Sequence, residues 1–250
     1  MVKNTDFYLS YSDLSQKSCP TIRVGIMDEQ IEATILLDGS FIIDNGKEIT
    51  GKIFAITIRD YISILDEKKN TIYKAQEIRF KNRGDATFTV FDVSIGKTFH
   101  WEKKERQTFK GDLVLKMRPH GTIAIINEIG IEDYLESVVS SEMKSTAPIE
   151  FLKAHAIISR SWLVYTLKEK DHIPSTKKTQ KDLYDESTMD EDTIIRWYEQ
   201  ESHDIYDVCA DDHCQRYQGI TKILTENPLR AVKETSGVVL TYNGLVCDTR

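Results

Sequence analysis

The hydrophobic pattern of this sequence changes its period close to residue 130, and this change limits the folds open to the chain. After this point Ile131, Leu135, Val138 and Val139 recur at helical spacing. Strands followed by helices predict an α+β fold. Before residue 130, runs rich in β-branched residues between Gly, Asp and Asn predict strands over 21–27, 31–37, 52–58, 87–93, 113–117 and 122–126.

A second helix is expected to begin at Ala147-Pro148, where proline fits the first turn, and to end near Leu167. It is apolar on most sides, as a buried helix is. We expect this helix pair to pack on the β-rich half. The residues expected to face each other across this packing include Leu135, Val139, Leu152 and Trp162.

The remainder of the chain is more polar. The stretch over 168–192 is predicted to be a solvated insertion, followed by a short helix over 193–200. Another helix is expected from Asn227-Pro228 to about Thr235. Asn243-Gly244 between apolar runs predicts a hairpin over 237–250. Because the second strand of this hairpin stops at Arg250, we expect a domain that has been shortened at this end.

These elements predict one domain over 21–250. Its expected parts are a β-rich part over about 21–128, a helical part over about 131–167, the insertion over about 168–192, a Cys/His loop over 203–219 and the C-terminal hairpin over 237–250.

Composition and charge exclude some classes of protein. The 250 residues are 40% hydrophobic and 29% charged, as in ordinary globular domains. The net charge of −7 argues against nucleic acid as a partner, since phosphate binding needs a basic face. No stretch approaches the roughly 20 apolar residues of a membrane span. The first ten residues lack the apolar run of a signal peptide, so the protein is cytoplasmic or its export signal is not in this sequence.

Glu142 is the first candidate for chemistry. On a helical wheel it falls between Leu135 and Val138, inside the apolar stripe, whereas the other acidic residues of the segment fall on the opposite side. A carboxyl group on an apolar face loses hydration, which favours its protonated form, as a general acid requires. The alternative is that the helix ends before Glu142 and leaves it on an exposed loop.

His155 and Arg160 lie in the apolar second helix. A lone histidine on such a face is more often a core residue than a catalytic one. A buried arginine needs carboxylate or carbonyl partners. For Arg160, bracing the two helices is therefore favoured over direct catalysis.

A cluster of metal-binding residue types lies in the Cys/His loop. His203, Cys209 and Cys214 offer imidazole and thiolate groups, the ligands that zinc prefers, with His213 beside Cys214. The spacing fits no standard zinc-finger pattern, and free thiols or a Cys209–Cys214 disulfide are the alternatives. We favour the metal, with water or Cys247 as the fourth ligand.

The helical part contains a recognisable motif. The segments INEIGIEDYLESVVSSEM (126–143) and APIEFLKAHAIISRSW (147–162) resemble the stage II sporulation protein D family, the SpoIID/LytB domain. Ser140 stands where the family pattern has proline, and His155 where it has glutamine. VCADDHCQRYQG (208–219) and SGVVLTYNG (236–244) also resemble family segments. The Cys-Gly-Gly that normally follows is absent, in agreement with a shortened domain.

The resemblance implies a lytic transglycosylase that cuts peptidoglycan between N-acetylmuramic acid (MurNAc) and N-acetylglucosamine (GlcNAc), preferably in strands stripped of stem peptides. It places the catalytic role on Glu142 and implies a structural zinc ion held by His203, Cys209 and Cys214. Residues expected to bind substrate are His155, Arg160, Gln215 and Tyr217.

The resemblance further implies a bacterial envelope location and an N-acetylmuramoyl-L-alanine amidase as a partner. Two other functions remain open. One is a non-catalytic amidase enhancer that binds wall or enzyme, and the other is a metal-bound structural module with no effect on glycan.

Overall fold

The computed structural model describes residues 20–96, 100, 102–172 and 203–249. The predicted helix over 193–200, and the insertion from 173 onward, lie outside these residues. Among the described residues, no helix is both long and apolar enough to cross a membrane.

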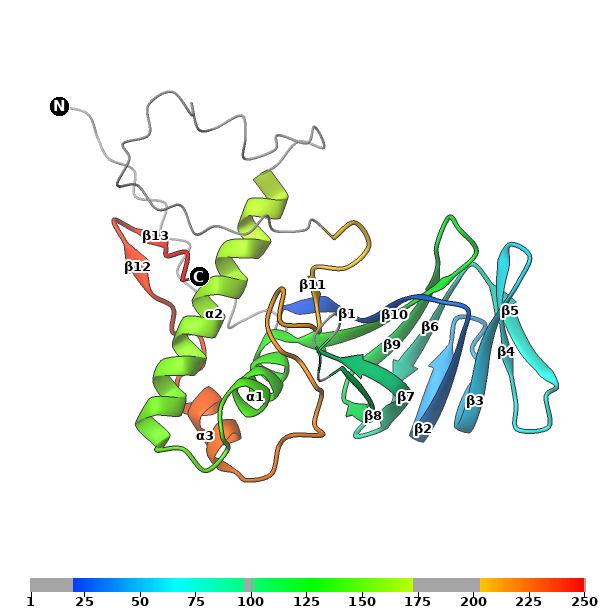
Figure 1. The fold of residues 1–250 in the computed structure, drawn as a ribbon, viewed down its shortest axis with the longest axis horizontal. Coiled ribbons are helices and arrows are strands. Elements are labelled where there is room, and N and C mark those ends of the chain that lie inside the picture. The colour runs from blue at the N-terminus through cyan, green and yellow to red at the C-terminus, as the bar shows by residue number, and fades with distance from the viewer. Residues whose placement is uncertain (1–19, 97–99, 101, 173–202, 250) are drawn as a thin grey trace.

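An eleven-stranded sheet forms most of the N-terminal half, as predicted for an α+β fold (Figure 1). Its strand order is β11-β1-β10-β9-β6-β2-β3-β4-β5, while β7 pairs with β2 and β8 pairs with β7. All pairs are antiparallel except β1–β11. The strands are β1 (Thr21–Gln30), β2 (Glu32–Ile43), β3 (Glu48–Ile58), β4 (Tyr61–Leu65), β5 (Thr71–Ala75), β6 (Glu77–Asn82), β7 (Thr87–Ile95), β8 (Lys103–Phe109), β9 (Asp112–Met117), β10 (Ile123–Gly130) and β11 (Val208–Cys209).

All six predicted strands are present, and β4, β5, β6, β8 and β11 were missed. Strand β8 shows why, because its sequence KKERQTF has no run of β-branched residues. Among the described strands it pairs only with β7 and so forms an edge, where charged side chains are common. Strand β11 has two residues and forms only through its pairing with β1.

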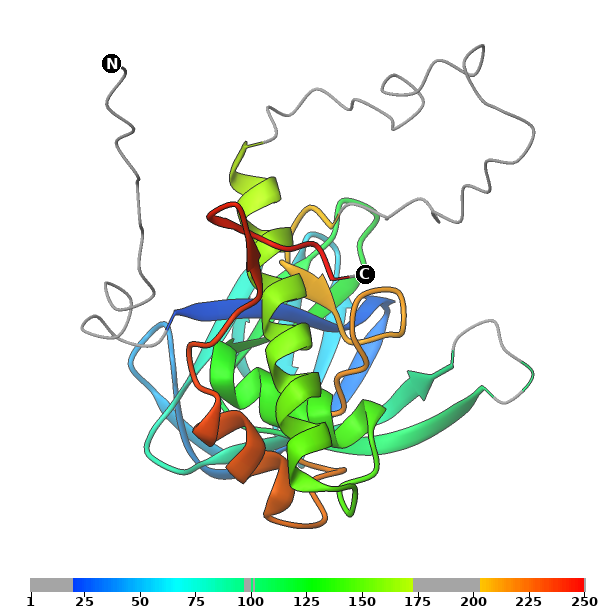
Figure 2. The ribbon, with the colours of Figure 1, turned by 90° about the vertical axis from the view of Figure 1, so that its left-hand side faces the viewer.

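In the described part of the chain, three helices pack at one end of the sheet (Figures 1 and 2). Helix α1 (Ile131–Glu142) follows β10 directly, α2 (Ile149–His172) lies against it, and α3 (Asn227–Glu234) contacts both. Helix α2 extends beyond the predicted end at Leu167, so the first residues of the expected insertion are helical. The hairpin strands β12 (Thr241–Tyr242) and β13 (Leu245–Val246) are shorter than expected.

The main core cluster contains residues of the sheet strands and of the helices that pack on the sheet. The four residues expected at this packing are buried, with exposed fractions of 0% for Leu135, Val139 and Leu152 and 5% for Trp162. Because Gly130 ends β10 and Ile131 begins α1, this core fixes the direction in which α1 leaves the sheet. The C-terminal end of α1 therefore has a defined position.

The segment after residue 203 returns to the sheet and then crosses to the helices. Strand β11 adds to β1, with Val24 opposite Val208 and Gly25 opposite Cys209. At Gly219 the chain has φ +58° and passes so close to β8 that a Cβ atom would clash with the carbonyl oxygen of Thr108. Only glycine fits there, and this crossing holds the Cys/His loop against the end of α1.

Candidate functional site

Glu142 is the last residue of α1, and three elements meet at its side chain. Its Oε1 accepts a hydrogen bond from the backbone N–H of Arg216, at 3.0 Å. Its Oε2 lies 2.9 Å from Nε2 of His155 on α2. The side chain is 26% exposed. The alternative in which the helix ends before Glu142 is therefore wrong. Leu135 and Val138, which flank Glu142 on the helical wheel, are buried as expected, while each oxygen of the carboxyl group has a polar partner.

His155 holds the carboxyl group from the second helix. Its side chain is 12% exposed, and its Nδ1 is buried without a hydrogen-bond partner among the described residues. A hydrogen atom on Nδ1 would therefore lack an acceptor, which favours the tautomer whose Nε2–H donates to Glu142. His155 thus borders the candidate site and fixes the orientation of the carboxyl group.

Arg160 does not reach a surface where a substrate could bind. Its side chain is fully buried and forms a double hydrogen bond with Glu132, from Nε at 3.0 Å and from Nη2 at 2.7 Å. Its Nη1 also donates to the carbonyl oxygen of Val238, at 3.1 Å. The expectation that Arg160 binds substrate is corrected by this burial. The residue joins α1, α2 and the C-terminal segment, as the alternative interpretation proposed.

Gln215 and Tyr217 are also buried, with exposed fractions of 7% and 1%. Gln215 accepts a hydrogen bond from the Tyr134 hydroxyl, at 3.2 Å, and donates one to the carbonyl oxygen of Ser159, at 3.3 Å. The Tyr217 ring stacks on Tyr134 with centroids 5.1 Å apart. Burial raises the pKa of both tyrosines, so their hydroxyls remain protonated. These contacts attach the loop to the helices, and the contact of Gln215 and Tyr217 with substrate stays a prediction.

Four side chains gather in the Cys/His loop, from His203 before β11 to Cys214 after it. The possible ligand atoms of His203, Cys209, His213 and Cys214 all lie within 4.8 Å of one another. The Cys214 sulfur is 3.3 Å from Nε2 of His203 and 3.6 Å from Nδ1 of His213, and the Cys209 sulfur is 3.8 Å from Nδ1 of His213. Cys247, weighed as a fourth ligand, is not in this group.

These separations fit one tetrahedral zinc ion. Zinc bonds of about 2.0–2.3 Å to nitrogen and sulfur imply ligand atoms roughly 3.3–3.8 Å apart. The Cys209 thiol has a lowered pKa, because hydrogen bonding with Cys214 and then His203 outweighs the opposing effect of burial. A lowered thiol pKa favours the thiolate that metals bind. The residues present therefore suit zinc, with His213 completing the set.

The local sequence explains how the loop closes. The Cys214 N–H donates to the carbonyl oxygen of Asp211, which forms a tight turn, and the Tyr217 N–H donates to the carbonyl oxygen of Ala210. Asp212 and Arg216 form two hydrogen bonds of 2.7 and 2.8 Å across the same turn. The turn brings the Arg216 N–H to Glu142. A backbone donor leaves no side-chain signal in a sequence, so the role of Arg216 was not predictable.

The fold and the site therefore define an α+β domain with one candidate acid–base residue beside a Cys/His cluster. Residues 119–242 match the family model described as Stage II sporulation protein (SpoIID). The matched range contains Glu142, His155 and all four Cys/His residues. This part of the chain therefore belongs to the SpoIID family, as the sequence motifs indicated.

A further similarity is to an uncharacterized protein of Brachyspira hyodysenteriae (strain ATCC 49526 / WA1). The two sequences are 27% identical over 154 residues, which is 61% of this chain. The chain spans 38% of the length of that relative.

Proposed function

We propose that this domain is a peptidoglycan lytic transglycosylase that cleaves MurNAc–GlcNAc linkages, with Glu142 as its general acid and base. The observation that carries the proposal is the position of Glu142. Its carboxyl group is partly exposed at the end of α1, and donors on α2 and on the Cys/His loop fix its orientation. Family membership of the surrounding 119–242 region supports the same conclusion.

The reaction needs one carboxyl group that acts twice. As an acid, Glu142 gives its proton to the glycosidic oxygen while the bond from that oxygen to C1 of MurNAc breaks. As a base, it then takes the proton of the C6 hydroxyl, whose oxygen bonds to C1 and closes a 1,6-anhydro ring. Water is not consumed, and Glu142 returns to its protonated form. The second carboxylate that a glycoside hydrolase requires is therefore not needed.

His155 and Arg216 act as positioning residues in this scheme. The Arg216 N–H holds Oε1 and the His155 imidazole holds Oε2, so that the carboxyl group cannot rotate freely. Proton transfer requires the donor and acceptor atoms to lie within hydrogen-bond distance. A fixed carboxyl orientation therefore favours both proton transfers.

Zinc is proposed as a structural cofactor held by His203, Cys209, His213 and Cys214. The bound ion would join the two ends of the loop that presents Gln215 and Arg216 to the helices. The chemistry above already has its acid and base, so the contribution of the metal is to stabilise the loop. The same proposal includes denuded glycan strands as the substrate, an amidase that removes their stem peptides as a partner, and a location in the bacterial envelope.

The experiment is muropeptide mass spectrometry on purified protein incubated with amidase-treated peptidoglycan. Glu142→Gln keeps the size of the side chain and removes the proton donor. We expect it to abolish anhydro-MurNAc products while glycan binding persists. Glu150→Gln is the matched control, because that carboxylate is exposed at the start of α2 and pairs only with Lys153 among the described residues. Equal product formation by wild type and Glu142→Gln would refute the catalytic role.

A different outcome would support the amidase-enhancer function. In that case wild-type protein alone yields no anhydro product, and added protein increases the release of stem peptides by an amidase.

A substitution at His155 tests its positioning role. The side-chain amide of His155→Gln can still donate to Glu142, whereas that of His155→Leu cannot. A hydrogen bond to a charged group contributes about 1.5–3 kcal/mol, so we expect kcat to fall roughly ten- to hundredfold in the leucine variant and to recover largely in the glutamine variant. Equal loss in both variants would contradict the positioning role.

A further inference from the structure

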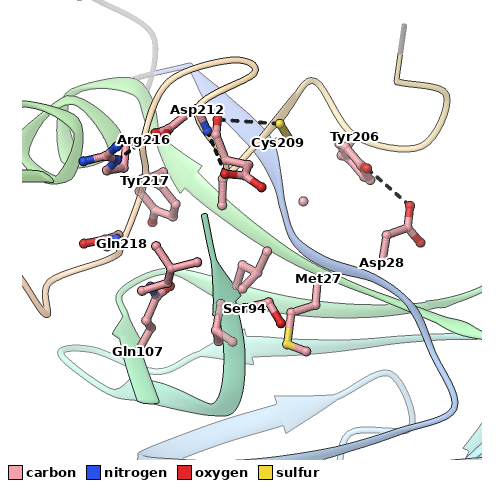
Figure 3. Close-up of a pocket in the computed structure, with 16 residues that line it drawn as sticks. Met27, Asp28, Ser94, Gln107, Tyr206, Cys209, Asp212, Arg216, Tyr217 and Gln218 are labelled. Atoms are coloured by element: carbon pink, nitrogen blue, oxygen red, sulfur yellow. Dashed lines mark hydrogen bonds and ion pairs between the residues drawn. The ribbon is translucent and has the colours of Figure 1, made fainter. Parts of the chain in front are cut away.

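A small cavity lies next to the loop that holds Glu142. Its volume is about 40 Å³, and it lies between β1, the ends of β7 and β8, and the loop segment from Cys209 to Gln218 (Figure 3). Arg216 connects the two places, because its backbone N–H donates to Glu142 and the same residue lines the cavity. The cavity and the candidate acid are therefore separated by one residue that contacts both.

Gln107 gives this cavity an unused hydrogen-bond acceptor. It occupies a core-facing position of β8, two residues before the buried Phe109, and is 1% exposed. Its Oε1 is buried and has no hydrogen-bond partner among the described residues. Leaving a buried acceptor unpaired is unfavourable, because the group has lost its hydrogen bonds to water. Because Gln107 lines the cavity, a ligand with an N–H group would satisfy it.

The size and lining of the cavity limit what that ligand can be. About 10–15 Å³ is needed to hold one water molecule, so the volume suits roughly three water-sized groups. Buried side chains of Met27, Val93 and Ile95 supply an apolar wall, and Gln218 adds a second amide. The ligand group should therefore be compact and combine an amide with a short apolar end.

The charged residues of the lining already have partners. Asp28 forms an ion pair with Arg118, and Asp212 forms one with Arg216. Asp211, the third acidic residue of the lining, accepts a hydrogen bond from the backbone N–H of Asp212. A bound cation or anion would have to compete with these internal pairs. A neutral group would leave both pairs intact, which favours an uncharged ligand.

We propose that this cavity is a specificity subsite for the 2-acetamido group of an amino sugar next to the bond that is cut. The acetamido N–H donates to Gln107 Oε1, and its methyl group packs on Met27, Val93 and Ile95. Its carbonyl oxygen accepts a hydrogen bond from the side-chain amide of Gln218. The inference rests on the proposed function, since it names the part of the glycan that the protein recognises.

The test measures binding by calorimetry in the Glu142→Gln background, where the glycan stays uncut. The probe is a soluble β-1,4-linked tetramer of N-acetylglucosamine. Gln107→Leu removes the acceptor and keeps a similar volume, and we expect it to weaken binding about fivefold. Gln76→Leu, an exposed glutamine outside the cavity, is the matched control and should bind as the parent does. Thermal stability should not fall in Gln107→Leu, because an unpaired buried acceptor is removed.

A second measurement changes the ligand and leaves the protein unaltered. The same tetramer carrying N-propionyl groups adds one methylene, for which a cavity of about 40 Å³ has no room. Overpacking costs about 1–3 kcal/mol, so we expect at least about fivefold weaker binding than with N-acetyl groups.

The outcomes separate this inference from the proposed function. Equal affinity of the parent and Gln107→Leu, or of the N-acetyl and N-propionyl tetramers, would overturn the subsite and leave the catalytic proposal standing. If wild-type protein forms no anhydro products while Gln107→Leu still weakens tetramer binding, only the catalytic proposal is overturned. Absence of tetramer binding to the parent would overturn the subsite, whereas the catalytic proposal is decided by the muropeptide assay alone.

Discussion

The ion pair between Arg160 and Glu132 gives a prediction that separates a structural role from substrate binding. Arg160 is fully buried, whereas the Glu132 side chain is 23% exposed. Breaking a buried ion pair by removing one partner costs about 3–5 kcal/mol, and most of this cost comes from the charge left behind. The two single substitutions should therefore differ in their effect on the free energy of unfolding.

Arg160→Met keeps the apolar stem and leaves only Glu132, which water can partly hydrate. We expect a loss near the lower end, about 3 kcal/mol. Glu132→Ala leaves a fully buried guanidinium group without its carboxylate, and the loss should lie near the upper end, about 5 kcal/mol. The free energy of unfolding is measured by urea titration with tryptophan fluorescence, because Trp162 is buried in α2. The urea midpoint should fall by about 1–2 M.

Arg230→Met is the control, since Arg230 forms an exposed i,i+4 pair with Glu234 on α3 and such pairs contribute little. Its urea midpoint should stay close to that of wild type. The reasoning is refuted if Arg160→Met leaves the midpoint unchanged and instead weakens glycan binding. That result would restore the substrate-binding role expected from the sequence.

Two further predictions concern the metal and the dependence on pH. Elemental analysis of freshly purified protein should find about one zinc ion per chain. Chelation or Cys214→Ala should lower the melting temperature by at least about 5 °C, and activity should fall together with stability. Metal-free protein with an unchanged melting temperature would contradict the zinc site. Burial alone would raise the pKa of Asp28, but hydrogen bonds from Arg118 and the backbone of Glu29 outweigh it and leave that pKa below its usual value. A lowered folded-state pKa stabilises the fold above the unfolded-state pKa, and this stability is lost as pH falls below about 4. The unfolding free energy of Asp28→Asn should therefore vary less between about pH 5 and 3 than that of wild type, and parallel pH profiles would count against the argument.

The sequence by itself determined the parts of this protein that depend on neighbouring residues. The change from strand-like runs to helical spacing predicted the α+β fold and placed α1 from Ile131, where the structure has it. The Ser-Glu-Met motif singled out Glu142, and the density of His and Cys singled out the loop that contains the four-residue cluster. Periodicity and motifs are carried by residues close together in the chain, so they can be recognised without a tertiary structure.

The tertiary structure alone decided which distant groups meet. Glu142 and the Arg216 N–H are 74 positions apart, and Arg160 reaches the carbonyl oxygen of Val238 across 78 positions. Gln107 belongs to a strand whose charged sequence gave no strand signal, and only its pairing with β7 turns this side chain inward. Apolar periodicity predicts that a position is buried, but it does not predict which group of the protein contacts the side chain there. The chemistry of this site depends on those contacts.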